Sequence, residues 1–313
     1  MIQKRITVFA PATISNLGSG FDVLGIAIDR PGDMVTAYRQ RAPGLSFSVR
    51  TNHANVPAEP QQNVAAHVAN LMLEEFQPPF GIRMVLHKKM PIGSGLGSSA
   101  ASSVASVVAV NGLLEKRLKK SDLLRFAVEG ERMASGAPHA DNVAPSLLGG
   151  ACLIRSYSPL DVISLPLRNS VVWVVVHPRI VVRTEEARRV LPAHVPLESA
   201  IRQWGNVSGL TVGLSSGDAR LIGKCVEDVI VEPLRAHLIP GFFTMKQSAL
   251  DAGATGCSIS GSGPSLFAVA ASMAIGRRIA AAMADACSHA ARVPCDVYIS
   301  KVNTRGATIL RKG

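Results

Sequence analysis

The sequence feature with the clearest chemical meaning is a run of small residues between a strand-like segment and an apolar segment, Pro91 to Ala101 (PIGSGLGSSAA). Three glycines at alternate positions remove the Cβ atoms that would keep a bulky anion away from the backbone. They also permit positive φ, so successive N–H groups can point inward. Ser98 or Ser99 would then cap a helix whose free N–H groups and dipole favour a phosphate. We interpret the run as a phosphate-binding loop; the alternative is that its small residues only let a helix pack closely on a sheet.

This loop matches neither of the two common nucleotide-binding patterns. Gly93 is followed five positions later by Ser98 and then by Ser99, so the P-loop pattern G-x-x-x-x-G-K-[ST] is absent. Ser98 also stands where the dinucleotide pattern G-x-G-x-x-G requires its last glycine. The sequence therefore predicts a phosphate site that is neither a Walker loop nor a dinucleotide turn.

Several polar residues before and after this loop are candidates for ligand contacts. Asn16 and Asp22 lie on a segment rich in turn residues between two expected strands, a common place for binding residues, although an Asx turn and a cap would also explain them. Lys88 and Lys89 end the strand that leads to the loop, where they could offset phosphate charge or simply be solvated. Glu131 falls near the C-terminal end of an expected helix, where the dipole disfavours a carboxylate. A divalent cation would explain Glu131, and a solvated surface glutamate is the alternative.

The middle and second half of the chain add further candidates. His139, Asp141 and Asn142 occur together in a segment dense in turn formers, residues 136–150, which we expect to be a site loop. Arg188 lies in the last turns of a short expected helix, and Arg235 lies on a break between expected helices, where an arginine could bind a carboxylate ligand or form a surface salt bridge. A second run of glycine and serine, residues 256–265, could face the same ligand as the first run from the opposite side.

The expected elements alternate without regular βαβ spacing, which favours an α+β fold with two layered lobes over a doubly wound sheet. We place the domain boundary near residue 160, with an N-terminal domain at 1–160 and a C-terminal domain at 161–313. Strands are expected at 5–10, 23–28, 34–39, 81–89, 151–155, 171–177, 266–270, 297–302 and 307–311. Helices are expected at 63–76, 99–114, from 121 onward, and at 184–191, 197–214, 217–231, 242–252 and 271–287, with a turn at 31–33 and a link between the halves at 156–169.

The composition describes a folded chain whose balance is basic. The 313 residues are 47% hydrophobic and carry a formal net charge of +11. A polyanionic partner must be considered, but aromatic residues make up only 4% and no nucleic-acid-binding motif is present, so we favour a basic enzyme that handles anions. The five cysteines are scattered and suggest neither disulfides nor a zinc site. Because no apolar run reaches the roughly 18 residues that a membrane span requires, we expect a soluble cytoplasmic protein.

Three runs in this order resemble the motifs of the GHMP small-molecule kinases: residues 11–22, 91–101 and 256–264. Within that superfamily the chain resembles the homoserine kinase family, because residues 139–145, Glu186-Ala187-Arg188, and residues 232–235 with 238–242 are similar to its signatures. The match spans nearly the whole length. The resemblance implies a two-lobed GHMP kinase fold with a ferredoxin-like C-terminal lobe. It also implies transfer of phosphate from ATP, with Mg²⁺, to the hydroxyl of L-homoserine in threonine biosynthesis.

The resemblance also implies roles for individual residues. Ser98, Ser99 and Glu131 would hold Mg²⁺. Homoserine would be surrounded by Asn16, Asp22, Asn142, Arg188 and Arg235. Asn63 and the pair Lys88 and Lys89 would lie towards the base of ATP. The residues that would surround its phosphates are Pro91, Ile92, Gly93, Ser94, Gly95, Leu96, Gly97, Ser98, Ser99, Ala100 and Ala101.

The catalytic group is open to two interpretations. Many GHMP kinases carry an aspartate base in the third catalytic position, whereas Asn142 stands near that position here. Asparagine cannot accept a proton at neutral pH, so we hypothesise that Asn142 positions the hydroxyl while the γ-phosphate or solvent accepts its proton. The rate would then come mainly from alignment and charge stabilisation. The neighbouring Asp141 is the rival base. The first motif departs mildly from the family pattern, with Ser19 where proline is usual.

Other functions remain as alternatives. Another GHMP kinase acting on mevalonate, shikimate or pantoate is the nearest one, although Asp22 would repel an acid that lacks an ammonium group. A catalytically silent nucleotide-binding protein is the alternative from a different class. A homodimer is compatible with the sequence, and we expect neither nucleic acid nor a membrane as a partner.

Overall fold

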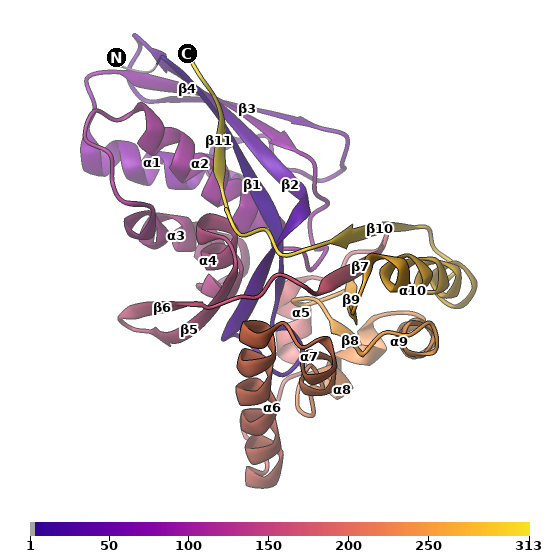
Figure 1. Cartoon of the computed structure of the whole chain (residues 1–313). Helices are drawn as coiled ribbons and strands as arrows, with labels where there is room; N and C mark the ends of the chain where they lie inside the picture. Colours follow the sequence, from indigo (N-terminus) through magenta and orange to yellow (C-terminus); the bar gives the residue numbers. More distant parts are fainter. Residues whose placement is uncertain (1–3) are drawn as a thin grey trace.

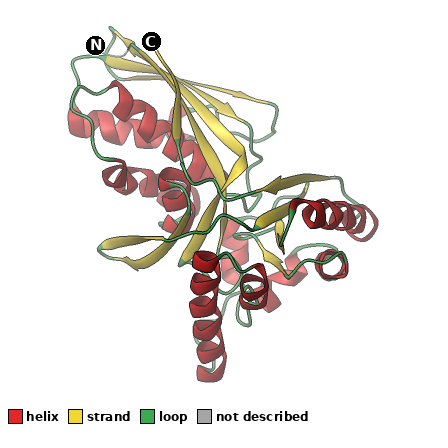
Figure 2. Ribbon diagram, in the orientation of Figure 1, coloured by secondary structure: helices red, strands yellow, loops and turns green. Residues whose placement is uncertain are grey.

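The computed structural model describes residues 4–313 and arranges them in two lobes, each built on its own β-sheet (Figures 1 and 2). The N-terminal lobe contains β1 (Arg5–Ser15), β2 (Leu24–Gln40), β3 (Leu45–Thr51), α1 (Val64–Phe76), β4 (Gly81–Lys88), α2 (Ser98–Leu113), α3 (Leu124–Ser135), α4 (Ala140–Leu148), β5 (Ala151–Tyr157) and β6 (Leu160–Leu165). Short 3₁₀ turns at Pro60–Gln62 and Lys120–Leu123 precede α1 and α3.

The first sheet has seven strands, in the order β11-β1-β2-β4-β3, with β5 paired to β2 and β6 paired to β5. Helices α1 to α4 lie together on one face of this sheet (Figure 1). Almost every residue of α2 is buried, as its small apolar sequence predicts, and α2 contacts both central strands. The start of α2 is therefore held firmly, which fixes the phosphate loop that precedes it.

The C-terminal lobe contains β7 (Val172–Pro178), α5 (Thr184–Arg189), α6 (Leu197–Ser216), α7 (Ala219–Cys225), α8 (Glu232–Arg235), α9 (Phe242–Asp251), β8 (Gly256–Ile259), β9 (Leu266–Ala270), α10 (Met273–Ala286) and β10 (Cys295–Ser300). A 3₁₀ turn at Ala236–Leu238 follows α8, and a π-helical turn at Cys287–Ala291 follows α10. Its antiparallel sheet runs β10-β7-β9-β8, the strand order of a ferredoxin-like βαββαβ unit. The last strand, β11 (Thr308–Lys312), returns to the edge of the first sheet beside β1.

The two lobes share one hydrophobic core. One face of the second sheet, with Trp173 and Phe267 at a ring separation of 5.8 Å, belongs to the same buried cluster as the N-terminal sheet and helices. The other face packs against α9 and α10. The fold expected from the resemblance, α+β with two lobes, is confirmed. Within the described residues, no helix combines the length and the apolar character needed to cross a bilayer.

Several expected elements differ from the structure. The strands expected on either side of 31–33 are one strand, β2, because the turn residues there form a bulge in its pairing with β1 rather than a reversal. Residues 136–150 are not a loop: α4 occupies most of that segment, and its interior proline lies in the last turns. The expected link at 156–169 contains β6, and β3 was not expected. The helix expected at 217–231 is limited to α7.

Candidate active site

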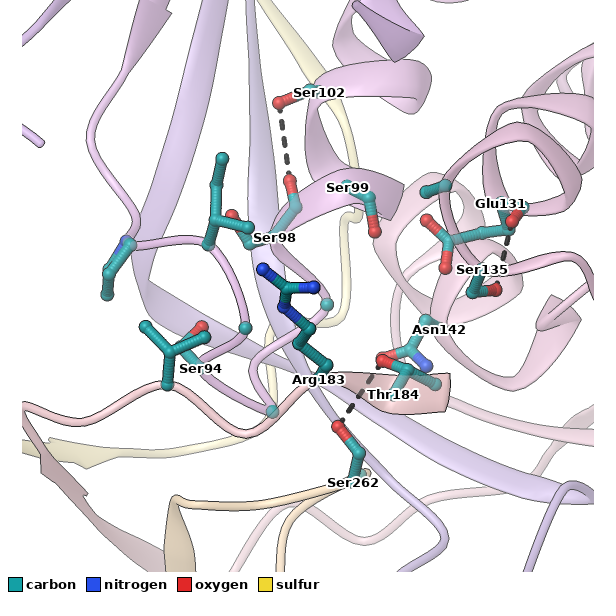
Figure 3. A pocket seen from close by; sticks show the side chains of 18 of the residues that line it. Ser94, Ser98, Ser99, Ser102, Glu131, Ser135, Asn142, Arg183, Thr184 and Ser262 are labelled. Carbon is teal, nitrogen blue, oxygen red and sulfur yellow. Dashed lines mark hydrogen bonds between the residues drawn. The ribbon is translucent and has the colours of Figure 1, made fainter. Parts of the chain in front are cut away.

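A cleft of about 1590 Å³ lies between the two lobes and is lined by residues from both. The phosphate loop and α3 supply one wall, and α5 and the segment 261–262 supply another (Figure 3). The segments that carry the three sequence motifs, far apart in the chain, therefore meet in one cavity.

The phosphate loop has the backbone conformation that its glycines suggest. Gly93, Gly95 and Gly97 have φ of 65°, 71° and 64°, in the left-handed region that other residues rarely adopt. The second lobe fixes the loop from behind: the Ser260 hydroxyl donates to the Gly95 carbonyl at 2.7 Å, and the Ser265 hydroxyl donates to the Ser94 carbonyl at 2.6 Å. Since these carbonyls are bound on the outer side, the loop is held in one conformation.

The helix after the loop lacks a side-chain cap, so the prediction that Ser98 or Ser99 caps it is wrong. Gly97 occupies the N-cap position, and α2 already begins at Ser98, whose hydroxyl donates to the Met90 carbonyl at 3.4 Å. The first N–H groups of an α-helix have no partner within the helix. Without a serine cap these N–H groups can bind an anion, so the missing cap favours the phosphate interpretation.

Lys88 lies beneath this helix start rather than free in the cleft. Its ammonium contacts the Asp33 carboxylate at 2.5 Å and donates to the Ser98 carbonyl at 2.6 Å and to the Ser102 hydroxyl at 2.9 Å. Asp33 is fully buried and also accepts from the backbone N–H of Lys89 at 2.8 Å. The pair therefore ties β2, the end of β4 and the first turn of α2 together.

Glu131, on α3, is a buried carboxylate with the properties of a candidate metal ligand. Its side chain is 4% exposed, and its Oε1 atom has no hydrogen-bond partner among the described residues. Burial raises the pKa of Glu131 to about 7, and the Ser99 hydroxyl and the charge of Lys88 oppose that rise only in part. Figure 3 shows Ser99 and Glu131 facing the same part of the cleft.

This arrangement fits a Mg²⁺ ion. Magnesium prefers one or two carboxylate oxygens together with hydroxyl, water and phosphate oxygens. Ser98, Ser99 and Glu131 provide such a set at the helix start, and the unpartnered Glu131 oxygen is the atom that a cation would satisfy. No group of three or more His, Cys, Asp or Glu side chains suited to a metal occurs in the described part of the chain. A cation here would therefore depend on phosphate oxygens as well.

A second group of charged residues lies on the far side of the phosphate loop. One terminal nitrogen of Arg188 donates to both carboxylate oxygens of Asp22, at 2.8 and 3.0 Å. Asn16 accepts from the Asp22 N–H at 3.0 Å and donates to the Gly261 carbonyl at 2.8 Å. Asn16 and Asp22 both have positive φ, 67° and 58°, so the loop that carries them is tightly wound. The two charges predicted to hold opposite ends of a zwitterion are paired with each other in this structure.

Arg235 completes the positive side of this pocket. It is 3% exposed and donates to the carbonyls of Ala187, at 2.9 Å, and Gly261, at 3.1 Å. Burial lowers the pKa of Arg235 to about 10. Its guanidinium lies 5.1 Å from the centre of the Phe21 ring. The structure thus brings the two predicted arginines to one pocket.

Asp141 and Asn142 lie in the first turn of α4. The Asn142 side-chain oxygen accepts from the Thr13 hydroxyl at 2.7 Å, which leaves its amide NH₂ for a ligand. Asp141 is 1% exposed, and its Oδ1 atom has no partner among the described residues. Burial, with the negative charges of Asp22 and Glu131 adding to it, raises the pKa of Asp141 to about 8. Burial therefore favours the protonated form of the Asp141 carboxyl at neutral pH.

Asn63 and Lys88, both predicted to contact the nucleotide, already form hydrogen bonds within the protein. Asn63 caps α1: its oxygen accepts from the Ala65 N–H at 3.0 Å, and its amide donates to the Pro57 carbonyl at 2.7 Å. Asn63, Lys88 and Lys89 nonetheless line the cleft. Their contacts with a nucleotide stay a prediction.

Some residues of the site were missed from the sequence. Arg183 reaches over the phosphate loop from the residue before α5 (Figure 3), and Thr13 fixes Asn142. Asp33 anchors Lys88, and the Tyr157 hydroxyl donates to the Asp22 carbonyl at 2.8 Å. The only sequence signal for Arg183 was its position directly before a helix whose later residue, Arg188, was already a candidate. The other three could not be found without knowing which strands pair.

Comparison with known proteins agrees with this architecture. The family model for the GHMP kinases N terminal domain matches residues 63–150, and the model for the GHMP kinases C terminal region matches residues 210–289. The curated homoserine kinase of Chlorobium phaeobacteroides (strain BS1) is 44% identical to this chain over 98% of its length and 100% of that protein.

Solved structures give the same result. The crystal structure of homoserine kinase from Cytophaga hutchinsonii has a TM-score of 0.93 and 46% identity, covering 99% of this chain and 98% of that one. The mevalonate kinase of L. major has a TM-score of 0.74 at 18% identity over 94% of each chain, which indicates a shared fold. The chain belongs to the GHMP kinases and, within them, to the homoserine kinase family.

Proposed function

We propose that this ATP-dependent small-molecule kinase transfers the γ-phosphoryl group of ATP to the hydroxyl of L-homoserine and forms O-phospho-L-homoserine. Two regions of the cleft meet at the observation that supports the proposal. The donor region is the loop 93–97 with the start of α2, and the acceptor pocket is formed by Asn16, Asp22, Asn142, Arg188 and Arg235. A Cβ atom on Gly97, the last residue of the phosphate loop, would lie 2.8 Å from the Asn142 side-chain oxygen. Phosphates bound at the helix start would therefore be adjacent to the residue proposed to hold the acceptor hydroxyl.

The donor region supports binding of a triphosphate. The loop 93–97 and the first turn of α2 offer backbone N–H groups, and Arg183 supplies a positive charge above them. When bound, a magnesium ion would neutralise charge on the phosphate oxygens. Glu131 would hold that ion, and the hydroxyl oxygens of Ser98 and Ser99 would be further ligands. Glu131 Oε1, which has no hydrogen-bond partner among the described residues, would then have the ion as its partner.

The acceptor pocket supports a small zwitterion. Arg188 and Arg235 can bind its carboxylate through charge-assisted hydrogen bonds, each worth roughly 1.5–3 kcal/mol. Asp22 can bind its ammonium group, and binding would require Arg188 to exchange one carboxylate partner for another. Mevalonate, shikimate and pantoate carry a carboxylate but no ammonium group. They would therefore leave Asp22 without a positive partner once Arg188 turns to the substrate's carboxylate.

The transfer step is proposed to need no protein base: the homoserine oxygen bonds to the γ-phosphorus as the bond to ADP breaks, and the transferred phosphate or solvent takes the hydroxyl proton. Asn142 has its oxygen held by Thr13 and can direct its amide to the acceptor oxygen, so that the oxygen is aligned with the transferred phosphorus. Asp141, the rival base, has its pKa raised to about 8 by burial, which favours its protonated form at neutral pH and makes it a poor proton acceptor. Alignment and charge stabilisation supply the rate in a loose phosphoryl-transfer transition state.

The test of the function is ADP release from ATP and Mg²⁺ with each of the four alcohols. Turnover with L-homoserine at least about tenfold above the other three in kcat/KM supports the proposal. Faster turnover with mevalonate, shikimate or pantoate would assign a different GHMP kinase. Nucleotide binding without turnover on any alcohol would identify a silent nucleotide-binding protein.

The base-free step is tested separately. Asp141→Asn and Asn142→Ala are compared in the same assay, with a nucleotide-induced thermal shift as the check that each variant folds and binds ATP. A collapse of kcat confined to Asp141→Asn rejects the base-free scheme. A larger loss for Asn142→Ala supports alignment by the amide.

A further inference from the structure

His177, on β7, is a buried histidine in the wall of the active-site cleft. Its Nδ1 atom lies 3.1 Å from the hydroxyl of Ser265, the residue directly before β9. The Ser265 hydroxyl donates in turn to the Ser94 carbonyl of the phosphate loop at 2.6 Å. A short chain of hydrogen bonds therefore runs from the second lobe to a loop that belongs to the first.

This chain of hydrogen bonds fixes which nitrogen of His177 carries the proton. A serine hydroxyl has one hydrogen and a carbonyl oxygen can only accept, so the hydrogen of Ser265 is committed to Ser94. The contact between Nδ1 and the Ser265 oxygen is then a hydrogen bond only if Nδ1 donates. The neutral ring of His177 is therefore the Nδ1–H tautomer, with an unprotonated Nε2.

The groups around His177 keep its ring neutral. Burial lowers the pKa of His177 to about 4; Asp296 opposes this shift, and Arg179 and His53 add to it. Asp296 pairs with His177 across β10 and β7, but Arg179 already binds the Asp296 carboxylate at 2.8 and 3.2 Å. At neutral pH His177 thus serves as an uncharged donor in a fixed place.

The Ser94 carbonyl matters because of the peptide group to which it belongs. A planar trans peptide bond joins Ser94 to Gly95, so the Ser94 carbonyl and the Gly95 N–H point in opposite directions. The carbonyl is held toward the second lobe, and the Gly95 N–H, which donates to no acceptor among the described residues, points the other way. The Ser260 hydroxyl holds the next carbonyl, that of Gly95, at 2.7 Å. Hydrogen bonds behind the loop therefore set where its N–H groups point.

We infer that His177 is a positioning residue for the phosphates of ATP. Its Nδ1–H holds the Ser265 hydroxyl on the Ser94 carbonyl. The bound carbonyl in turn aims the Gly95 N–H at a phosphate. Without the Nδ1–H, the Ser265 hydroxyl is free to rotate and the peptide group loses the bond that orients it. The inference rests on the proposed binding of ATP by the loop, and His177 acts there through two other residues.

Three replacements of His177 test the role of its donor. His177→Leu removes the donor, His177→Asn places an amide NH₂ near the position of Nδ1, and His177→Gln places its amide near the position of Nε2. His177→Leu and His177→Gln should raise KM for ATP by about fivefold, the effect of losing one hydrogen bond, and leave KM for homoserine unchanged. His177→Asn should stay within about twofold of the wild type in both constants.

The order of these effects separates positioning from folding. Asparagine is the smallest of the three replacements and leaves the largest cavity, so a loss of stability alone would not spare His177→Asn. Denaturant titration measures that stability. An equal rise of KM for ATP in all three variants, or no rise in any, overturns the inference. The matched control is His289→Leu, since His289 is exposed and lies beside Asp285, and it should change neither KM.

Binding of ATP and Mg²⁺ without homoserine separates this inference from the proposed function. Isothermal titration calorimetry should give the same order, with the dissociation constant raised in His177→Leu and His177→Gln and restored in His177→Asn. That order supports the inference even if the wild type does not phosphorylate homoserine. Equal dissociation constants in all variants of an enzyme that does phosphorylate homoserine overturn the inference alone.

Nuclear magnetic resonance tests the tautomer directly. In the full chain labelled with ¹⁵N-histidine, the ring signals that disappear in His177→Asn belong to His177. At pH 7 these signals should be those of a neutral ring with its proton on Nδ1. A neutral ring with its proton on Nε2, or a charged ring, overturns the inference.

Discussion

The phosphate loop and the acceptor pocket differ in the groups that face a ligand: backbone N–H groups in the loop and charged side chains in the pocket. The loop offers the backbone N–H groups of one continuous segment, and other parts of the chain hold it from behind, among them Ser260 and Ser265. The homoserine pocket proposed above consists of side-chain charges: Asp22, Arg188 and Arg235 come from three separate segments, and Arg188 donates to Asp22 in this structure. The loop is thus a local structure, whereas the pocket exists only in the folded chain.

This difference predicts how each region responds to substitution. Adding atoms should damage the loop, because its function depends on the absence of side chains. Removing atoms should damage the pocket, because its function depends on charged side chains. KM for ATP and KM for homoserine, measured in the same variant, separate these two effects.

The largest effect is expected at the cation site between the two regions. Glu131→Gln should lower kcat by about 10²–10³-fold, the usual cost of removing one preorganised charge-stabilising group. Steady-state ADP release at saturating substrates measures it. The matched control is Glu129→Gln, two residues earlier on α3, whose carboxylate pairs with Arg132 on the surface. A loss in both variants, or in neither, would contradict the cation role of Glu131.

Loss of a pocket arginine should act on homoserine alone. Arg188→Met should raise KM for homoserine by about 10–100-fold, because a charge-assisted bond worth roughly 1.5–3 kcal/mol is lost, while KM for ATP changes little. Arg189→Met is the control, since Arg189 is exposed and pairs with Glu185. An equal rise in KM for ATP would show that the two regions are not separable.

An added methyl group in the loop should act on the nucleotide. The new Cβ of Gly95→Ala would lie 2.4 Å from the Ser260 carbonyl oxygen, in a backbone conformation with φ of +71°. The loop must shift, so KM for ATP should rise at least about tenfold. Gly44→Ala has a similarly positive φ of +80° but meets nothing within 4 Å, so it should cost stability without changing KM. Unchanged nucleotide binding in Gly95→Ala would refute the backbone cradle.

The two buried carboxyls should make the free protein less stable as pH rises. Burial raises the pKa of Glu131 to about 7 and that of Asp141 to about 8, well above the pKa of an exposed carboxyl, which is about 4. Between the pKa of these carboxyls in the unfolded chain, about 4, and their raised pKa values in the folded chain, the folded state binds more protons than the unfolded state. The free energy of unfolding therefore falls from about pH 4 to about pH 8. Denaturant titrations at pH 5 and 8.5 measure it. Asp141→Asn should flatten this dependence, and a steeper fall in that variant would contradict the assignment.

The smallest effect is expected from Tyr157→Phe. Its hydroxyl holds the Asp22 carbonyl at 2.8 Å, and loss of one neutral hydrogen bond costs about 1 kcal/mol. KM for homoserine should rise by about fivefold with kcat unchanged. Tyr38→Phe is the control, because the Tyr38 ring contacts Arg5 and Arg83 away from the cleft. A fall in kcat alone would show that Tyr157 does not act through the homoserine pocket.

The sequence by itself predicted the family and the two-lobed fold, and it pointed to the loop at 91–101. The glycine spacing, the small apolar composition of the helix that follows and the order of the three motifs can all be read along the chain. The sequence also supplied the candidate residues Glu131, Asp141 and Asn142, but it treated the segment of the last two as a loop. The structure gives a helix there, since packing of α4 against β1, β2 and α2 outweighs its turn-forming residues.

Only the tertiary structure decided which charges meet. The pairing of Asp33 with Lys88 joins residues 55 positions apart, and that of Asp22 with Arg188 joins residues 166 positions apart. Electrostatic partners depend on distance in space, which strand pairing and lobe docking set, and no local pattern encodes that distance. The roles of the site residues toward ATP, Mg²⁺ and homoserine stay predictions. The burial that raises the pKa values of Glu131 and Asp141 is likewise a property of the folded chain alone.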